Sequence, residues 1–465
     1  MPSLSEGKEM LMAANFRAAR RVRRAHWFKA RLALIGALSA VAVAACGSSS
    51  SSSATSKSAS ASAAAKPVSG QVPASAKQTI VFAVQGGAGA SASFGGEGEF
   101  TEKEIVSFEK AHPNITVKPI TISGSSVEVA RSQVQNYFLA GDSTPDVIDS
   151  DQTWVAPWAR AGWIAPLDQA FGARRSQWFP AAVAAGTYNH HLYALSWYYN
   201  AEGLYYNTSL VHAAPTTPQQ VVAEAHAALQ ADPSLKAGFA FDGYKDEGLV
   251  TLLTTVLGHP IDVAHLDNPA TLKALQYIHD LVYKYGVTPK AVVDWQLPAT
   301  QPLFTNGQAA MLLDWPYVYQ IAESKGSKVI GKTAYIPFPS VSGVPAAAVG
   351  GDMLTVNAHT KHMAAVIEFL QWLETPANQT ARAIFSGDPP SLLSAYTPAL
   401  FKAAPYFRQE VHVFKVAVAR PVNPNYEQIT ADLQNMISSV LANQQSPAQA
   451  LQSTAQQVAP LASSS

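Results

Sequence analysis

Cysteine is almost absent from this chain, which has one, Cys46, in 465 residues. A single thiol excludes an internal disulfide framework and a zinc site built on cysteines. Charge is also scarce, because charged residues make up 14% of the chain where about 25% is usual. Beyond residue 45, 24 basic residues stand against 30 acidic ones. This balance lacks the excess of basic residues that is typical of nucleic-acid-binding proteins, so we expect no nucleic-acid partner.

The motifs of common catalytic and cofactor sites are missing too. The glycine-rich stretch 86–91 lacks the GK[ST] ending and the spacing of the dinucleotide fingerprint, which disfavours nucleotide binding. His359 and His362 lie three apart, but no HExxH motif follows, so surface or capping histidines are the better interpretation. No GxSxG elbow occurs. We therefore expect no cofactor and no metal. A glycosidase needs only two carboxylates, so a secreted glycan hydrolase stays open as the alternative.

The N-terminal region predicts export. A basic segment from Arg17 to Arg31 precedes an uncharged, apolar run of 14 residues, 32–45. A membrane-spanning helix needs about 20 residues, so this run predicts a secretory signal. It ends in VAAC at Cys46, which resembles the lipobox of bacterial lipoproteins. The resemblance implies a signal peptide over 1–45 and a diacylglycerol on Cys46. The alternative is an ordinary signal peptidase site with an incidental thiol.

Residues 46–76 predict a flexible tether, because serine, alanine, lysine and glycine dominate them and cannot bury much apolar surface. The folded part should begin at an apolar strand over 78–84. A strand over 114–120, a helix over 127–140 and a strand near 145–149 follow, and this alternation predicts an α/β fold. We expect one further strand at 333–337. We expect further helices at 218–229, 249–257, 269–285 and 361–373, and two helices between 426 and 458.

The stretch 194–210 carries five aromatic residues together with Asn200 and Glu202. Its composition favours an extended path. On a strand, Asn200 and Glu202 share one face because they lie two apart. The alternative is a buried core strand. If this run crosses between two halves of the protein, the shared face would meet a ligand.

Aromatic residues recur beside carboxylates and amides along the chain. Ring faces combined with a few hydrogen-bonding groups are typical of a small-molecule cleft, and charge-assisted bonds to hydroxyls suit a sugar. For each cluster alone, core packing is the alternative. The clusters are Asp151 with Trp154, Trp197 with Asn200, Phe241 and Tyr244 with Asp242 and Glu247, Asp314 with Trp315 and Tyr317, and Asn425 with Tyr426.

Several stretches together resemble the extracellular sugar-binding lipoproteins of bacterial ABC importers, over almost everything from Lys77 to the C-terminus. Those that carry the resemblance are 145–151 with Trp154 and 166–168, 203–207 with Pro215 and Pro218, 304–311, and 349–351 with 365–370 and 375–376. Two others are similar to the trehalose/maltose-binding branch: 238–243 with 247–249, and 419–422 before Pro424 and Tyr426.

The resemblance implies a two-lobed periplasmic-binding-protein fold of the α/β class, with a hinge and an interlobe ligand cleft. The first lobe would take 77–197 and a return segment of about 333–381. The second lobe would take 198–332 and about 382–465. The stretch 194–210 would then be the first crossing between the lobes.

The resemblance also implies ligand contacts. In relatives, aspartate often stands at the position of Asn200 and an aromatic residue at that of Asp246, which leaves the identity of the sugar open. Gly350 and Gly351 would allow a close approach of the backbone. The expected ligand-binding residues are Gln85, Asp151, Trp154, Asn200, Glu247, Trp315, Tyr317, Gly350, Gly351, Arg420 and Tyr426, with Glu97 as a weaker candidate.

These expectations combine into one function. The protein would be a monomer, anchored by lipid on the extracellular face of the bacterial cytoplasmic membrane. It would capture a disaccharide such as trehalose or maltose and deliver it to ABC transporter permease subunits, without being an enzyme. Besides the hydrolase, a sugar-sensing lipoprotein is a second alternative to this transport function.

Overall fold

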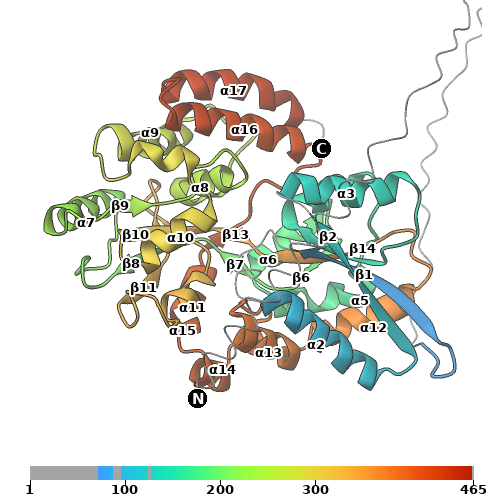
Figure 1. Ribbon diagram of the computed structural model, residues 1–465. Helices are drawn as coiled ribbons and strands as arrows, with labels where there is room; N and C mark the ends of the chain where they lie inside the picture. The colour runs from blue at the N-terminus through green and yellow to red at the C-terminus, as the bar shows by residue number, and fades with distance from the viewer. Residues whose placement is uncertain (1–71, 87–95, 124–126, 463–465) are drawn as a thin grey trace, which may run out of the picture. The chain divides into compact units, whose positions relative to one another are not determined.

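The computed structural model describes residues 72–86, 96–123 and 127–462 (Figure 1). The predicted signal peptide, Cys46 and most of the predicted tether lie outside the described residues, as does the side chain of Glu97. Within the described part, no helix is both long and apolar enough to cross a membrane.

The first lobe is built on a five-stranded sheet in the order β2-β1-β3-β14-β6. Its strands are β1 (Gln78–Gly86), β2 (Ile115–Ser123), β3 (Val147–Asp151), β6 (Ala194–Ser196) and β14 (Asp352–Val356). β1 runs parallel to β2 and β3, whereas β14 runs antiparallel to β3 and β6.

Large aromatic rings fill the core between this sheet and its helices. Phe82 of β1 packs edge-on against Phe369 of α12 (Met363–Leu373), with 5.5 Å between ring centroids. Phe108 of α2 (Gly96–Ala111) meets the same ring at 5.0 Å. Two segments far apart in sequence therefore cover one strand, and the predicted α/β class is confirmed.

The second lobe has a four-stranded sheet in the order β11-β8-β10-β9. Its strands are β8 (Gly203–Asn207), β9 (Ala237–Ala240), β10 (Ala309–Asp314) and β11 (Thr333–Ile336). β11 corrects one expectation, because the resemblance places the segment from about Thr333 in the return into the first lobe. It pairs antiparallel with β8, from Thr333 opposite Asn207 to Ile336 opposite Leu204, so it belongs to the second sheet.

The helices of the second lobe begin where the sequence supplies a capping residue followed by proline. Thr217 caps α7 (Pro218–Ala231), and Asn268 caps α9 (Pro269–Tyr283). Each cap side chain accepts a bond from a free N–H of the first turn, and the proline gives up an N–H that has no partner there. The final two helices, α16 (Tyr426–Leu441) and α17 (Pro447–Ala462), lie side by side, with the expected break before Pro447 (Figure 1).

Two chain segments join the sheets. The first runs from β6 through β7 (Asn200–Ala201) into β8, and the second runs from β13 (Pro345–Gly350) into β14. They pair antiparallel, with Gly350 opposite Asn200. Gly351 has φ +90°, and a Cβ there would lie 2.4 Å from the carbonyl oxygen of Tyr198. Only glycine fits that turn between the sheets.

The remaining elements connect these parts. They are α3 (Val127–Leu139), α4 (Val155–Arg160), α5 (Asp168–Phe171), α6 (Pro180–Ala185), α8 (Gly248–Leu257), α10 (Leu297–Thr305), α11 (Val318–Ala322), α13 (Pro376–Ser386), α14 (Pro398–Ala403), α15 (Phe407–Phe414), β4 (Thr187–Tyr188), β5 (His191–Leu192), β12 (Phe338–Pro339), β15 (Ala417–Val418), and the short 3₁₀ helices η2 (Gln152–Trp154), η3 (Gly172–Gln177), η4 (Lys290–Asp294) and η5 (Leu393–Ala395).

Candidate functional site

One buried cation connects the two lobes. Arg420, whose side chain is 4% exposed, lies 3.2 Å from a carboxylate oxygen of Asp151 and 2.7 Å from one of Glu247. Asp151 ends β3 of the first sheet, Glu247 directly precedes α8, and Arg420 follows β15. We call these three residues the Arg420 clamp. Its carboxylate side chains are 15% and 12% exposed, so all three charges are largely removed from water.

Neutral donors complete the surroundings of both carboxylates. The hydroxyl of Tyr426 donates to Glu247, and Thr430 donates to its other oxygen at 2.5 Å. Asp151 accepts from the backbone N–H of Thr153 at 2.8 Å and from its hydroxyl at 2.7 Å. Burial raises the pKa of Glu247, and Arg420 opposes that rise. The clamp is therefore a polar centre whose oxygens can exchange protein donors for ligand hydroxyls.

Asn200 lies on the crossing strand. It is 7% exposed, and its side-chain oxygen accepts no hydrogen bond within the described part of the chain. Its strand partner is Gly350, where a Cβ would lie 2.5 Å from the ring of Trp315. The half-buried indole of Trp315 thus packs on the crossing segments. The close approaches of Gly350 and Gly351 are made to Trp315 and Tyr198, and their contact with a ligand stays a prediction.

Three other expected residues lie outside the clamp, two of them in packed surroundings. Trp154 is fully buried, with its ring centroid 5.0 Å from that of Trp158. The hydroxyl of Tyr317, which is 7% exposed, accepts from the side-chain amide of Gln301 at 2.7 Å. Gln85 donates its backbone N–H to Asp149 at 2.9 Å. The structure therefore brings Asp151, Glu247, Arg420 and Tyr426 together in one hydrogen-bonded network. Trp154, Tyr317 and Gln85 do not belong to that network.

Four carboxylates lie together beside the clamp, and we call them the acidic edge: Glu202, Asp242, Asp246 and Asp314. The sequence analysis names each of them separately, but it neither groups them nor includes them among the expected ligand-binding residues. Asp314 ends β10, Glu202 precedes the start of the antiparallel β8, and Asp242 follows β9, so all three lie at one end of the sheet. The signal that could have grouped Asp242 and Asp314 was an acid at the carboxyl end of each of two apolar strands, β9 and β10, where α/β sheets bind ligands.

Burial dominates the acidic edge. It raises the pKa of Glu202 to about 7, although hydroxyls of Thr255 and Thr251 donate to the carboxylate at 2.9 and 3.4 Å and Arg420 also acts to lower the pKa. Burial likewise raises the pKa of Asp314, which is fully buried and accepts from the backbone N–H of Trp315 at 2.7 Å. Acids whose pKa is strongly shifted by burial are typical of functional sites.

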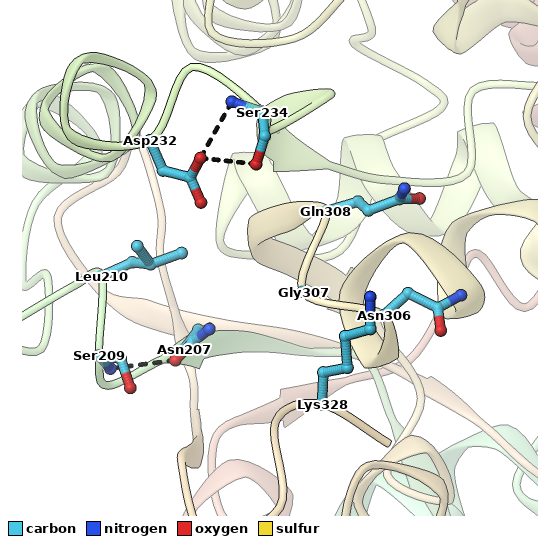
Figure 2. A pocket seen from close by; sticks show the side chains of 9 residues that line it. All are labelled: Asn207, Ser209, Leu210, Asp232, Ser234, Asn306, Gly307, Gln308 and Lys328. Carbon is cyan, nitrogen blue, oxygen red and sulfur yellow. Dashed lines mark hydrogen bonds between the residues drawn. The ribbon is translucent and has the colours of Figure 1, made fainter. Parts of the chain in front are cut away.

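A separate hollow lies at the opposite end of the second sheet (Figure 2). It has a volume of about 360 Å³. β8 ends there at Asn207, and β10 begins just beyond Gln308, whereas Asp314 and Gly203 pair at the other end. We call it the distal hollow. Its lining residues are Asn207, Ser209, Leu210, Asp232, Ser234, Asn306, Gly307, Gln308 and Lys328.

Two α/β lobes, joined by paired crossing strands and by a buried polar clamp, define a hinged binding protein. The family of bacterial extracellular solute-binding proteins matches residues 91–380 of this chain. The chain belongs to that family, whose members bind solutes and are not enzymes. A relative from Deinococcus radiodurans, a probable ABC transporter-binding protein, is 28% identical over 303 residues, or 60% of this chain and 71% of the relative.

Solved structures agree on the fold. A maltose-bound MalE3 from T. maritima superposes with a TM-score of 0.72 at 27% identity, covering 82% of this chain and 98% of that one. The GacH receptor of Streptomyces glaucescens, solved with acarbose, gives a TM-score of 0.70 at 20% identity, covering 83% and 99%. The predicted two-lobed periplasmic-binding-protein fold is therefore confirmed.

Proposed function

We propose that this protein captures a sugar, most simply a disaccharide such as trehalose or maltose, and delivers it to the permease of an ABC transporter. One observation carries the proposal: Arg420 joins Asp151 of the first lobe to Glu247 of the second. A ligand that bonds to the clamp contacts both lobes at once, so its binding energy favours the closed state.

The chemistry around the clamp supports a polyhydroxyl ligand. Asp151 and Glu247 offer charged acceptors, Arg420 and Tyr426 offer donors, and Asn200 has a spare acceptor oxygen. Trp315 adds a half-buried ring beside Asn200. The maltose bound by the T. maritima relative and the transporter named for the Deinococcus relative favour the same function.

We also propose that Cys46 anchors the protein by lipid to the extracellular face of the cytoplasmic membrane. The support is its position as the sole cysteine, directly after the signal-like run and before the serine-rich segment. Replacing it should release the protein from cells. If Cys46→Ala stays fully with the membrane fraction, another element holds the protein there.

Calorimetric titration of the purified protein tests the binding proposal. We expect saturable binding of at least one sugar among trehalose, maltose and longer glucans, with the sugar recovered unchanged. Absence of binding to all of them would contradict the proposal, and release of shorter products would favour the hydrolase.

A further inference from the structure

The start of α16 makes a second contact between the lobes, outside the clamp. Tyr426 donates to Glu247 of the clamp. The residues on either side of Tyr426 contact helices of the first lobe instead. We call this contact the latch, and it joins Asn425 and Glu427 to Arg131 and Gln135 of α3 and to Arg160 of α4.

Glu427 meets two groups from one face of α3. Its Oε1 lies 3.1 Å from Nε of Arg131 and accepts from the side-chain amide of Gln135 at 2.8 Å. Arg131 and Gln135 lie four residues apart, so they share a face of the helix. Val134 and Phe138, on another face of α3, are buried in the core of the first lobe. The first-lobe side of the latch is therefore fixed by packing.

The other side of the latch is fixed to the second lobe. Ile429, Leu433 and Ile437 of α16 are fully buried in the same core as Leu253 of α8 and Leu281 of α9. Because each side of the latch belongs to a separate core, rotation of the lobes about the crossing strands would pull its atoms apart.

Asn425 makes its contact with the first lobe in place of a local bond. An asparagine directly before a helix commonly accepts from a free N–H of the first turn. The side chain of Asn425 makes no such bond within the described helix. Its oxygen accepts from a guanidinium N–H of Arg160 at 3.3 Å, and its amide donates to the carbonyl oxygen of Leu461 at 2.7 Å. A helix cap is thus replaced by a bond between the lobes.

We propose that Glu427, supported by Asn425, is a positioning residue for sugar capture, which touches no sugar and holds the lobes together once the sugar is bound. The latch rests on the proposed function, because it sets the lifetime of the bound state. The latch and the clamp share the segment 420–427, so closure around a sugar at the clamp also forms the latch. Opening must break the latch before the sugar leaves, whereas the sugar enters before the latch forms. The latch should therefore slow dissociation and leave the association rate nearly unchanged.

Charge reversal tests the latch on the purified full chain. Arg131→Glu and Glu427→Lys each place like charges opposite one another, and we expect each to speed dissociation about three- to tenfold. The effect is limited because 43% of the Glu427 side chain is exposed to water. The double variant restores an ion pair and should return the rate to within about twofold of the unmodified protein. Calorimetry with maltose and trehalose gives the affinity, and stopped-flow fluorescence separates the two rates.

The double variant also separates the latch from the stability of the helix. Glu427 lies in the first turn of α16, where its charge favours the helix dipole. Arg131→Glu cannot restore that contribution to Glu427→Lys, so recovery in the double variant reports the contact alone. Asp432→Asn is the matched control on the same helix. Asp432 bonds to Gln428 of α16, so this variant should change neither rate.

Distances between the lobes test the latch without a sugar. Cys46 is the only cysteine, so Cys46→Ala provides a background without thiols. Glu102→Cys in α2 and Gln219→Cys in α7 then place one exposed label site in each lobe. Distances between spin labels should lengthen in each single charge reversal and recover in the double variant.

The outcomes separate the two proposals. If maltose or trehalose binds and neither single reversal speeds its dissociation, or the double variant does not restore the rate, the latch is wrong and the proposed function stands. If no sugar binds, the proposed function fails. Label distances that stay the same in the single variants would then show that the latch fails as well.

Discussion

The two ends of the second sheet treat charge in opposite ways. At the distal hollow, Asp232 is open to water and accepts two bonds from Ser234, which lower its pKa (Figure 2). At the other end, burial raises the pKa of Glu202 and of Asp314. Charge at the hollow is hydrated and requires no special partner. At the acidic edge, burial penalises the charged form of each carboxyl group, a cost that natural sequences tolerate mainly where function needs it.

The largest expected effect comes from removing the buried cation of the Arg420 clamp. Arg420→Met would leave Asp151 and Glu247 buried without a counter-charge, and we expect it to lower the free energy of unfolding by about 3–5 kcal/mol. Urea denaturation at pH 7 measures this loss.

The distal hollow supplies the control for that variant. Lys328 is exposed, so Lys328→Met should change the free energy of unfolding by no more than about 0.5 kcal/mol. Equal effects of the two substitutions would mean that the clamp adds no more to stability than a surface charge does.

The second effect is a dependence of stability on pH. Glu202 has its pKa raised from 4.5 to about 7, so the folded protein keeps a proton that the unfolded chain has already released. Its contribution to stability is complete below pH 4.5 and is lost as the pH rises through 7, a change of about 3 kcal/mol.

Glu202→Gln should remove this contribution and flatten the pH profile relative to the unmodified protein. Thermal unfolding between pH 4.5 and 8 compares the two. Asp232→Asn, at the distal end, should leave the fall in stability over this range in place. An unchanged slope in Glu202→Gln would show that another group of the acidic edge titrates there.

The third effect concerns ligand affinity. Truncating one clamp carboxylate leaves a sugar hydroxyl without its charged partner, so Asp151→Ala or Glu247→Ala should lose about 1.5–3 kcal/mol of binding, or roughly 10- to 150-fold in affinity. Titration with the best sugar from the calorimetric screen measures it. A folded variant that binds as well as the unmodified protein would remove that residue from the site.

Sequence reasoning succeeded where the pattern is local. The apolar strand at 78–84 and the helices at 249–257 and 269–285 are present close to the expected bounds. It failed where the position of an element depends on the strand that it pairs with. A short apolar strand such as Thr333–Ile336 does not encode which sheet it joins. Trp154 shows the same limit, since a large ring beside a carboxylate suits a core as well as a cleft.

The grouping of the acidic edge could not be predicted for a related reason. Glu202, Asp242 and Asp314 are separated by 40 or more residues in the chain and meet only through the order of strands β8, β10 and β9. Asp151, Glu247 and Arg420 were named together only through the resemblance to a family. The structure brings them together, and their contact with a sugar stays a prediction.

The smallest expected effect concerns Trp315, which directly follows β10 and packs on the crossing strands. Its ring packs on Gly350, opposite Asn200 in the strand pairing, so a change in the crossing alters the surroundings of the indole. Closure around a sugar should therefore change tryptophan fluorescence. Trp315→Phe keeps a ring face and should weaken binding by only about two- to fivefold, as expected for one aromatic contact.

Trp163→Phe is the control for the fluorescence signal. Trp163 stacks on Phe138 in the first lobe, 5.4 Å between centroids, away from the crossing strands. The sugar-dependent signal should persist in Trp163→Phe and disappear in Trp315→Phe. If Trp315→Phe leaves both affinity and signal unchanged, Trp315 is a core residue, because a ring that neither touches the sugar nor senses closure contributes only packing. The aromatic surface of the cleft would then have to come from Tyr426, which already donates to Glu247.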